Sequence, residues 1–155
     1  MKYIFYILFG LAFYSSTAQN SNDINFMVTV NEELMISLSN FRIDVNSTNK
    51  SNSFLLRYVP GKLKLTAEEY NAIFLSQHSE LEVSFTAGFY DKEEYYQYDY
   101  KIPFKKKWLV EEFCVLSLYN LNKKKYRKKF KPLHEDGRYS FSINLPSSSI
   151  FNLKQ

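Results

Sequence analysis

The chain has 155 residues, and its 20 Lys and Arg residues against 16 Asp and Glu residues give a formal net charge of +4 at pH 7. A single cysteine excludes a disulfide bond within the chain, which separates it from the small secreted scaffolds that several such bonds stabilise. Lysine is far more frequent than arginine, the residue better suited to forked phosphate recognition, so the basic balance is a weak indication of a polyanionic partner.

Residues 1–18 have the three-part pattern of a secretory signal peptide. A positive start is followed by an apolar run from Tyr3 to Tyr14, and small residues occupy the positions that a signal peptidase reads. The apolar run is shorter than the roughly 20 residues that a membrane-spanning helix needs. We therefore expect cleavage before Gln19, export to the periplasm or the exterior, and one domain over residues 19–155 without a transmembrane segment.

The first half of this domain alternates apolar and polar residues, which is the pattern of half-buried strands. A turn is expected at residues 31–33, a break near Asn40, and a polar surface loop over residues 46–53. The expected strands cover residues 24–30, 34–38, 41–45 and 54–59, with a short extended piece at 63–65.

One helix is well marked after Thr66. Thr66 and Glu69 have the spacing of a capping box, in which each side chain bonds to the other residue's amide. Tyr70, Ile73 and Phe74 then recur at the spacing of one apolar helical stripe. We expect a short helix that covers one edge or end of the sheets.

The second half of the chain contains the clearest hairpin pattern. Residues 81–89 alternate strictly, an acidic turn follows at 91–94, and residues 96–102 alternate again. Pro103 and the lysines at 105–107 are expected to end this strand. Two further strands are expected over residues 112–121 and 139–145.

Short strands separated by frequent turns predict a mainly β protein. We expect an antiparallel β-sandwich, Ig-like or transthyretin-like in shape, in preference to a partly closed barrel. It would have about 7–8 strands and one short helix. Sandwiches host many unrelated functions, so this fold class alone indicates no activity.

Residues 123–131 form the most basic segment of the chain. They are a candidate surface for an acidic protein, an acidic glycan or a lipid phosphate surface, and the lysines at 105–107 would enlarge it if they lay nearby. Interleaved Tyr126 and Phe130 would also suit single-stranded nucleic acid, although export argues against that partner. The alternative is a solvated loop, or an edge strand whose lysines prevent aggregation. The cations of the segment are Lys123, Lys124, Lys125, Arg127, Lys128, Lys129 and Lys131.

A ladder of tyrosines is the second candidate. The two-residue period of a strand places Tyr96, Tyr98 and Tyr100 on one face and Tyr95 on the other. An exposed strip of this kind would bind sugar rings. The alternative is that the same face packs inward between two sheets.

No group of residues indicates catalysis. His78 and His134 lack the spacing of a metal site, and Cys114 lies in an apolar run where burial is expected. The paired carboxylates at 68–69, 93–94 and 111–112 have explanations as a helix cap, a turn and opposite faces of a strand.

The sequence therefore predicts an exported, non-catalytic binding protein of the cell envelope or exterior, with a protein partner and no cofactor or metal. Alternatives are a module that binds a glycan or an anionic surface and, less favoured, a hydrolase with a dispersed site.

Overall fold

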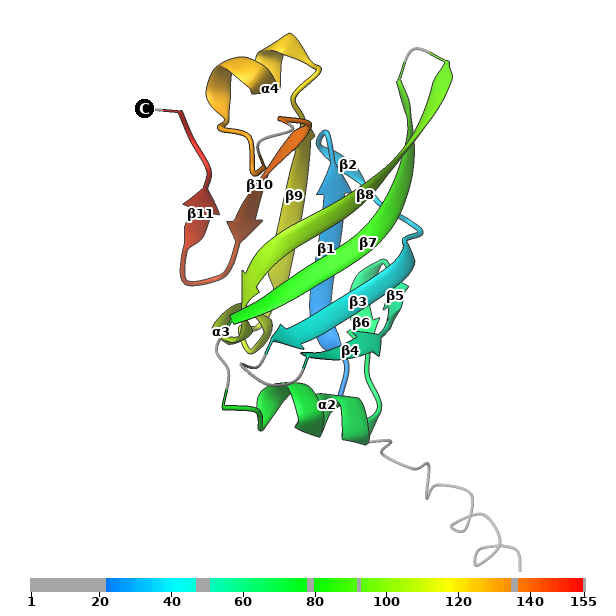
Figure 1. The fold of residues 1–155 in the computed structure, drawn as a ribbon, viewed down its shortest axis with the longest axis vertical. Coiled ribbons are helices and arrows are strands. Elements are labelled where there is room, and N and C mark those ends of the chain that lie inside the picture. Colours follow the sequence, from blue (N-terminus) through cyan, green and yellow to red (C-terminus); the bar gives the residue numbers. More distant parts are fainter. Residues whose placement is uncertain (1–21, 47–50, 78–79, 92, 135–136, 155) are drawn as a thin grey trace, which may run out of the picture.

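A computed structural model describes residues 22–46, 51–77, 80–91, 93–134 and 137–154 of the chain (Figure 1). The expected signal peptide, residues 1–18, lies outside the described residues. The prediction of a mainly β protein with antiparallel sheets is confirmed. The expectation of about 7–8 strands and one helix is wrong, since the described residues contain eleven strands and three helices. The additional elements are short, and elements of two to six residues carry little periodic signal.

The strands are β1 (Ile24–Val30), β2 (Glu33–Leu34), β3 (Ser39–Asn46), β4 (Ser51–Leu55), β5 (Arg57–Val59), β6 (Gly61–Lys64), β7 (Glu80–Asp91), β8 (Glu94–Lys105), β9 (Cys114–Asn120), β10 (Tyr139–Asn144) and β11 (Ser149–Phe151). The helices are α2 (Ala67–Phe74), α3 (Lys106–Leu109) and α4 (Lys124–Lys129). Within the described residues, no helix has the length and apolar character needed to cross a bilayer.

The strands form two sheets. Sheet A has the order β11-β10-β9-β1-β6-β5, with β2 also paired to β1, and sheet B has the order β4-β3-β7-β8. Between described strands, every pairing is antiparallel except that of β1 with β9, which is parallel from Phe26↔Cys114 to Val30↔Leu118. The first strand of the domain therefore lies in the middle of sheet A.

A two-residue turn joins β1 to β2, as expected for this segment. Asn31 and Glu32 have φ angles of 55° and 76°, and Val30 pairs with Glu33 across the turn. Two consecutive residues with positive φ are the signature of the type I′ turn, which matches the twist of the flanking strands. Glycine is the usual residue at the second position, and here Glu32 occupies it.

The chain passes from sheet B to sheet A at Leu56. The expected strand over residues 54–59 is split there, because β4 belongs to sheet B and β5 to sheet A. Leu56 is buried and donates its N–H to the Phe41 carbonyl at 2.8 Å. An apolar run that changes sheets has the same sequence pattern as one continuous strand.

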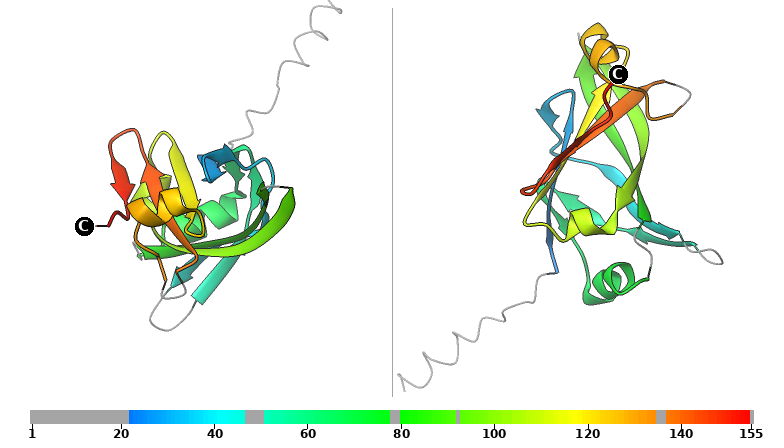
Figure 2. Two further views of the ribbon diagram at one scale, coloured as in Figure 1. Left: turned by 90° about the horizontal axis from the view of Figure 1, so that it is seen from above. Right: turned by 90° about the vertical axis from the view of Figure 1, so that its left-hand side faces the viewer.

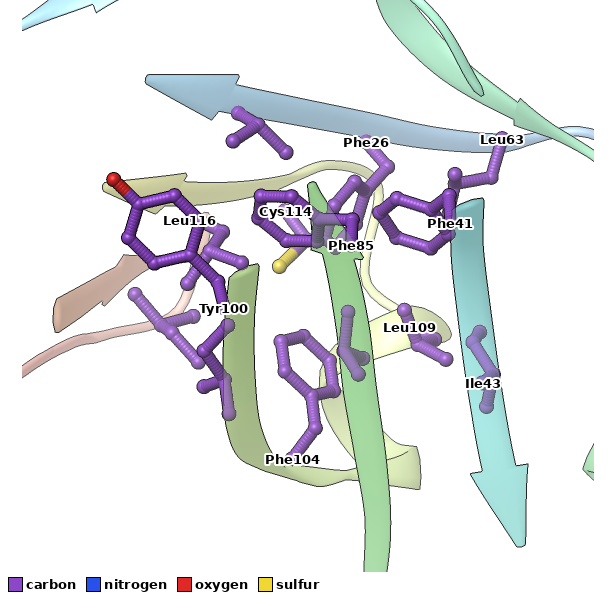
Figure 3. Close-up of a cluster of buried hydrophobic side chains, with 14 of the residues drawn as sticks. Phe26, Phe41, Ile43, Leu63, Phe85, Tyr100, Phe104, Leu109, Cys114 and Leu116 are labelled. Carbon is purple, nitrogen blue, oxygen red and sulfur yellow. The ribbon is translucent and has the colours of Figure 1, made fainter. Parts of the chain in front are cut away.

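The main buried cluster contains residues of both sheets (Figure 3). The Phe26 ring of sheet A meets the Phe41 ring of sheet B edge-on, with centroids 5.7 Å apart, and lies 6.0 Å from the Phe104 ring. The alternation of β7 is confirmed, because Leu81, Val83, Phe85, Ala87 and Phe89 are all buried.

Pro103 does not end the second strand of the hairpin, contrary to expectation. β8 continues to Lys105, and it is the outer strand of sheet B. The N–H of Lys101 bonds to a side chain of sheet A instead of β7, so the backbone at Lys101, and at Pro103 two residues on, faces away from β7. A proline costs no ladder hydrogen bond at such an edge position.

The predicted capping box of α2 is confirmed. Thr66 Oγ1 accepts the Glu69 N–H at 3.2 Å, and the Glu69 carboxylate accepts the Thr66 N–H at 2.8 Å. Ile73 of this helix is fully buried. Helix α2 lies at one end of the molecule with α3 close by, whereas α4 lies at the other end (Figures 1 and 2).

Candidate functional site

The basic segment at residues 123–131 contains a helix, so both the loop and the edge-strand alternatives are wrong. Helix α4 spans Lys124–Lys129. Tyr126 and Phe130 are 3% and 2% exposed and lie four residues apart, which places them on one side of the helical turn. The i, i+4 spacing of these two aromatic residues is the feature of the sequence from which a helix could have been expected.

The aromatic side of α4 packs on a small second cluster of buried residues. Phe130 stacks on Tyr119 of β9 with ring centroids 4.1 Å apart, and Leu121 and Tyr126 complete the cluster. Because Leu118 points into the main core, the neighbouring Tyr119 lies on the opposite face of sheet A. Helix α4 is therefore fixed to the outer face of this sheet.

Backbone bonds from the C-terminal segment hold the far end of α4. The N–H of Lys131 donates to the Asn152 carbonyl at 2.8 Å, and the N–H of Lys154 donates to the Lys129 carbonyl at 3.0 Å. The chain that follows β11 thus runs beside the end of α4. Its hydrogen bonds restrict the position of the helix on sheet A.

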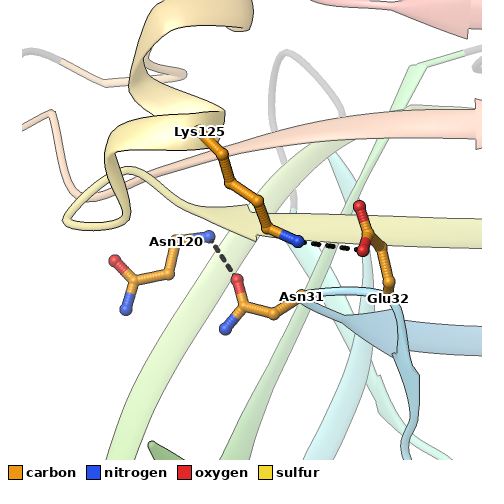
Figure 4. Close-up of polar contacts among 4 residues, drawn as sticks. All are labelled: Asn31, Glu32, Asn120 and Lys125. Atoms are coloured by element: carbon orange, nitrogen blue, oxygen red, sulfur yellow. Dashed lines mark hydrogen bonds and ion pairs between the residues drawn. The ribbon is translucent and has the colours of Figure 1, made fainter.

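The β1–β2 turn holds the start of α4 through an ion pair (Figure 4). The Lys125 ammonium donates to the Glu32 carboxylate at 3.0 Å, and Asn31 Oδ1 accepts the Asn120 N–H at 2.9 Å. The hydrogen bond from Lys125 holds the pKa of Glu32 below its ordinary value. Contacts with Tyr126 and then with Glu32 raise the pKa of Lys125. Both groups are thus charged near neutral pH.

Five of the six remaining cations of the segment face solvent, and the sixth, Lys123, is half-buried at the N-cap of α4. Lys124, Arg127, Lys128 and Lys131 are exposed, and none of them forms an ion pair with another described residue. Lys129 is also exposed, with its ammonium 5.2 Å from the Phe130 ring centroid. We call this set of five residues the α4 surface. These positive charges face solvent above the buried aromatic side of the helix. Such a surface suits a negatively charged partner.

The lysines at 105–107 do not enlarge the α4 surface, because they lie at the end of the molecule that carries α2 and α3 (Figure 1). There they line a pocket of about 500 Å³ together with Tyr70, Phe74, Glu80 and Val110. Sequence reasoning missed this pocket, since it is formed by segments more than 25 residues apart, such as Phe74 and Lys106.

No family model, curated protein or solved structure matches this chain. A function must therefore be inferred from its own surfaces.

The tyrosine ladder has the predicted alternation but is not an open strip. Tyr96 and Tyr98 are half-buried and stack on Phe89 at 5.9 and 5.7 Å between ring centroids, and Tyr100 is only 2% exposed. Tyr95 lies on the other face, as predicted, and its ring is 58% exposed. The three tyrosines thus contribute to the core cluster and its margin.

The exposed aromatic side chains of this hairpin are Tyr90 and Tyr95. They are 70% and 58% exposed, and their ring centroids are 5.3 Å apart. The Tyr95 hydroxyl lies over the backbone of Gly88, where any side chain would collide with it. The rings are tilted by 58° relative to each other, so they do not form a flat platform.

Cys114 is buried, as expected. Burial, with a smaller contribution from Glu111, raises the pKa of its thiol to about 12. A thiol in this environment is almost entirely protonated at neutral pH, and the protonated form is a poor nucleophile.

The other titratable residues considered from the sequence are dispersed. His134 Nε2 lies 3.1 Å from the Lys101 carbonyl oxygen, and His78 is outside the described residues. Glu111 accepts a hydrogen bond from Ser147 Oγ at 2.8 Å and, like Glu112, precedes β9 instead of lying in it. The described residues hold no group of three His, Cys, Asp or Glu side chains able to coordinate a metal ion.

Proposed function

We propose that this chain is an exported, non-catalytic binding protein of the cell envelope or exterior, and that its α4 surface contacts an acidic partner protein. The observation that carries the proposal is the combination of an anchored helix with exposed cations that have no ion-pair partner among the described residues. Lys124, Arg127 and Lys128 are the central cations of this surface.

The anchoring of α4 favours a protein partner over a lipid or glycan surface. A mobile basic tail is sufficient for attraction to a diffuse anionic surface. Here the aromatic underside, the Glu32–Lys125 pair and the C-terminal segment fix the helix, so its charges have a defined spacing. Complementary fixed charges give specificity and fast association between proteins.

The proposal includes a β-sandwich of Ig-like or transthyretin-like shape over residues 19–155 and a signal peptide cleaved before Gln19. The shared buried cluster of the two sheets supports the sandwich. The positive start, apolar run and small residues of the first 18 positions support the signal peptide.

Partner capture with two charge-matched variants tests the proposed interface. One variant carries Lys124→Gln, Arg127→Gln and Lys128→Gln. The control carries Arg57→Gln, Lys62→Gln and Lys64→Gln, which remove the same number of charges from exposed side chains of β5 and β6, including Lys62 at 4.0 Å from Asp23. The protein purified after export is immobilised, exposed to an envelope extract at low and moderate salt, and analysed by mass spectrometry.

We expect the wild type and the β5–β6 control to retain one stoichiometric protein at moderate salt, and the α4 variant to lose it. The retained protein should carry an acidic surface, and its binding should weaken as salt rises. Equal retention by all three forms would remove the α4 surface from the proposal. If the immobilised protein retained acidic glycans or anionic vesicles but no protein, the partner would be a glycan or a lipid surface instead of a protein.

A further inference from the structure

The pocket beside α2 has an apolar wall. Tyr70 and Phe74 lie one helical turn apart with ring centroids 4.4 Å from each other, and both side chains are only half-buried. Val110, which follows α3, is 64% exposed. Ile73 is the fully buried residue of this helix, whereas Tyr70 and Phe74 pack against the margin of the main core and also line the pocket.

The charged wall comes from the point where β8 ends and α3 begins. Lys105 is the last residue of the strand, and Lys106 and Lys107 form the first turn of the helix. Among the described residues that line the pocket, the acidic one is Glu80, whose carboxylate is 3.9 Å from the Lys105 ammonium. Three ammonium groups therefore face one carboxylate, which leaves an excess of positive charge.

Lys106 holds the two helices in place. Its ammonium donates to the Phe74 carbonyl at 3.3 Å and to the Ser76 carbonyl at 2.5 Å. These carbonyls lie at the C-terminal end of α2, where the helix leaves its last acceptors without internal partners. Lys107, in contrast, is exposed and forms no ion pair with a described residue. Lys106 thus builds the pocket, Lys107 is available to a ligand, and Lys105 can contact one only by sharing its charge with Glu80.

We propose that this pocket binds a small amphiphilic carboxylate. Its hydrocarbon part would lie against Tyr70, Phe74 and Val110, and its carboxylate would contact Lys105 and Lys107. The volume of about 500 Å³ is within the range of small-molecule sites. A cationic ligand would meet three like charges, and an uncharged one would forgo the interaction with the lysines. The site is separate from the α4 surface and does not depend on the proposed partner.

Calorimetric titration of the full chain with three linear eight-carbon compounds tests the proposal. Octanoate, octanol and octylammonium contain the same number of carbon atoms and differ in the charge of the head group. We expect saturable binding of octanoate, and weaker binding of octanol and octylammonium. Amide NMR shifts upon octanoate addition should be largest near α2 and α3. Equal binding of the three compounds, or no binding of octanoate, would overturn the proposal.

Two variants locate the interaction while leaving the structural Lys106 unchanged. Lys105→Gln combined with Lys107→Gln should weaken octanoate binding by roughly fivefold, as expected for two exposed charge contacts. Val110→Ser should weaken octanoate and octanol alike, because it reduces the apolar wall. The control is the α4 variant with Lys124→Gln, Arg127→Gln and Lys128→Gln, which should bind octanoate like the wild type.

Circular dichroism confirms that each variant is folded before titration. Equal octanoate affinity of the Lys105/Lys107 variant and the wild type would contradict the pocket, and an equal loss in the α4 variant would show attraction by overall charge. Loss of partner capture in the α4 variant with intact octanoate binding would separate the two proposed sites.

Discussion

The hydroxyl group of Tyr139 bonds to both backbone groups of Lys101. It accepts the Lys101 N–H at 2.8 Å and donates to the Lys101 carbonyl at 2.9 Å. Lys101 lies in β8, the outer strand of sheet B, and Tyr139 begins β10 of sheet A. The Tyr139 side chain of sheet A therefore provides hydrogen-bond partners for the backbone at the outer edge of sheet B, and it connects the two sheets.

Tyr139→Phe should lower the free energy of unfolding by about 1 kcal/mol, because the Lys101 N–H loses its partner at a half-buried site, while the Lys101 carbonyl keeps its contact with His134 Nε2. The ring contact with Tyr100 at 4.8 Å should persist in this variant. Urea denaturation followed by fluorescence measures the change. Tyr95→Phe is the control, since that side chain is mostly exposed; equal stability of both variants would contradict the role of the Tyr139 hydroxyl.

Glu32 and Lys125 should titrate as a pair. The pKa of Glu32 is lowered, so the stability it contributes is present above its unfolded-state pKa and is lost as pH falls through the folded-state pKa. The pKa of Lys125 is raised, so its contribution is lost as pH rises through that value. NMR titration of the Glu32 carboxyl carbon should show a higher pKa in Lys125→Met than in the wild type. An unchanged value would mean that the ion pair is not populated in solution.

The backbone conformation of Glu32 should lower the free energy of unfolding, because its φ of 76° lies in the left-handed region that favours glycine. Glu32→Ala and Glu32→Gly both remove the ion pair, so their difference reports the backbone alone. We expect the glycine variant to be more stable by about 1 kcal/mol in thermal or urea unfolding. Equal stability would indicate that the turn relaxes in solution.

Cys114 should be inert in the folded protein. Burial raises its pKa to about 12, so very little thiolate exists at pH 8. Reaction with a colorimetric disulfide reagent should be slow in buffer and rapid in concentrated urea, with one thiol released per chain. Rapid reaction of the native protein would show that β9 opens readily.

Tyr98→Ala separates packing from sugar binding. Tyr98 is half-buried on Phe89, so its truncation should lower the unfolding free energy by about 2 kcal/mol, less than for a fully buried aromatic residue. Tyr95→Ala should change it by less than about 0.5 kcal/mol. Unchanged stability of Tyr98→Ala together with lost retention on a sugar column would restore the aromatic strip as a binding site.

Long elements with one strong pattern were predicted well. The β7–β8 hairpin has strict alternation over many residues, and α2 has a capping box, so local chemistry alone indicates both. A turn was also expected at residues 31–33, and it lies at Asn31 and Glu32, but the strand expected over residues 34–38 is reduced to the two residues of β2. Local preference and the final fold agree in the hairpin and in α2, whereas Glu32 adopts a φ angle that favours glycine.

The errors occurred where tertiary contacts decide the structure. Helix α4 has only six residues, and its lysines are equally compatible with a loop until Tyr126 and Phe130 are seen to pack on Tyr119. Pro103 is tolerated because β8 is the outer strand of sheet B, a position that depends on the pairing of segments distant in the chain. The pocket beside α2 depends on Lys106 reaching the end of that helix. None of these relationships is encoded within one short window of sequence.

The place of β1 has a consequence for the order in which the protein folds. Thr29 and Ser117 bond to each other across the parallel β1–β9 pair although 88 positions separate them. Pairs so distant along a chain form slowly, since much of the chain must be ordered to close the loop. Strand β1 is therefore synthesised long before β9, and sheet A cannot be completed until β9 is available to pair with it. We expect chains truncated before Cys114 to expose the bare edge of β1 and to aggregate.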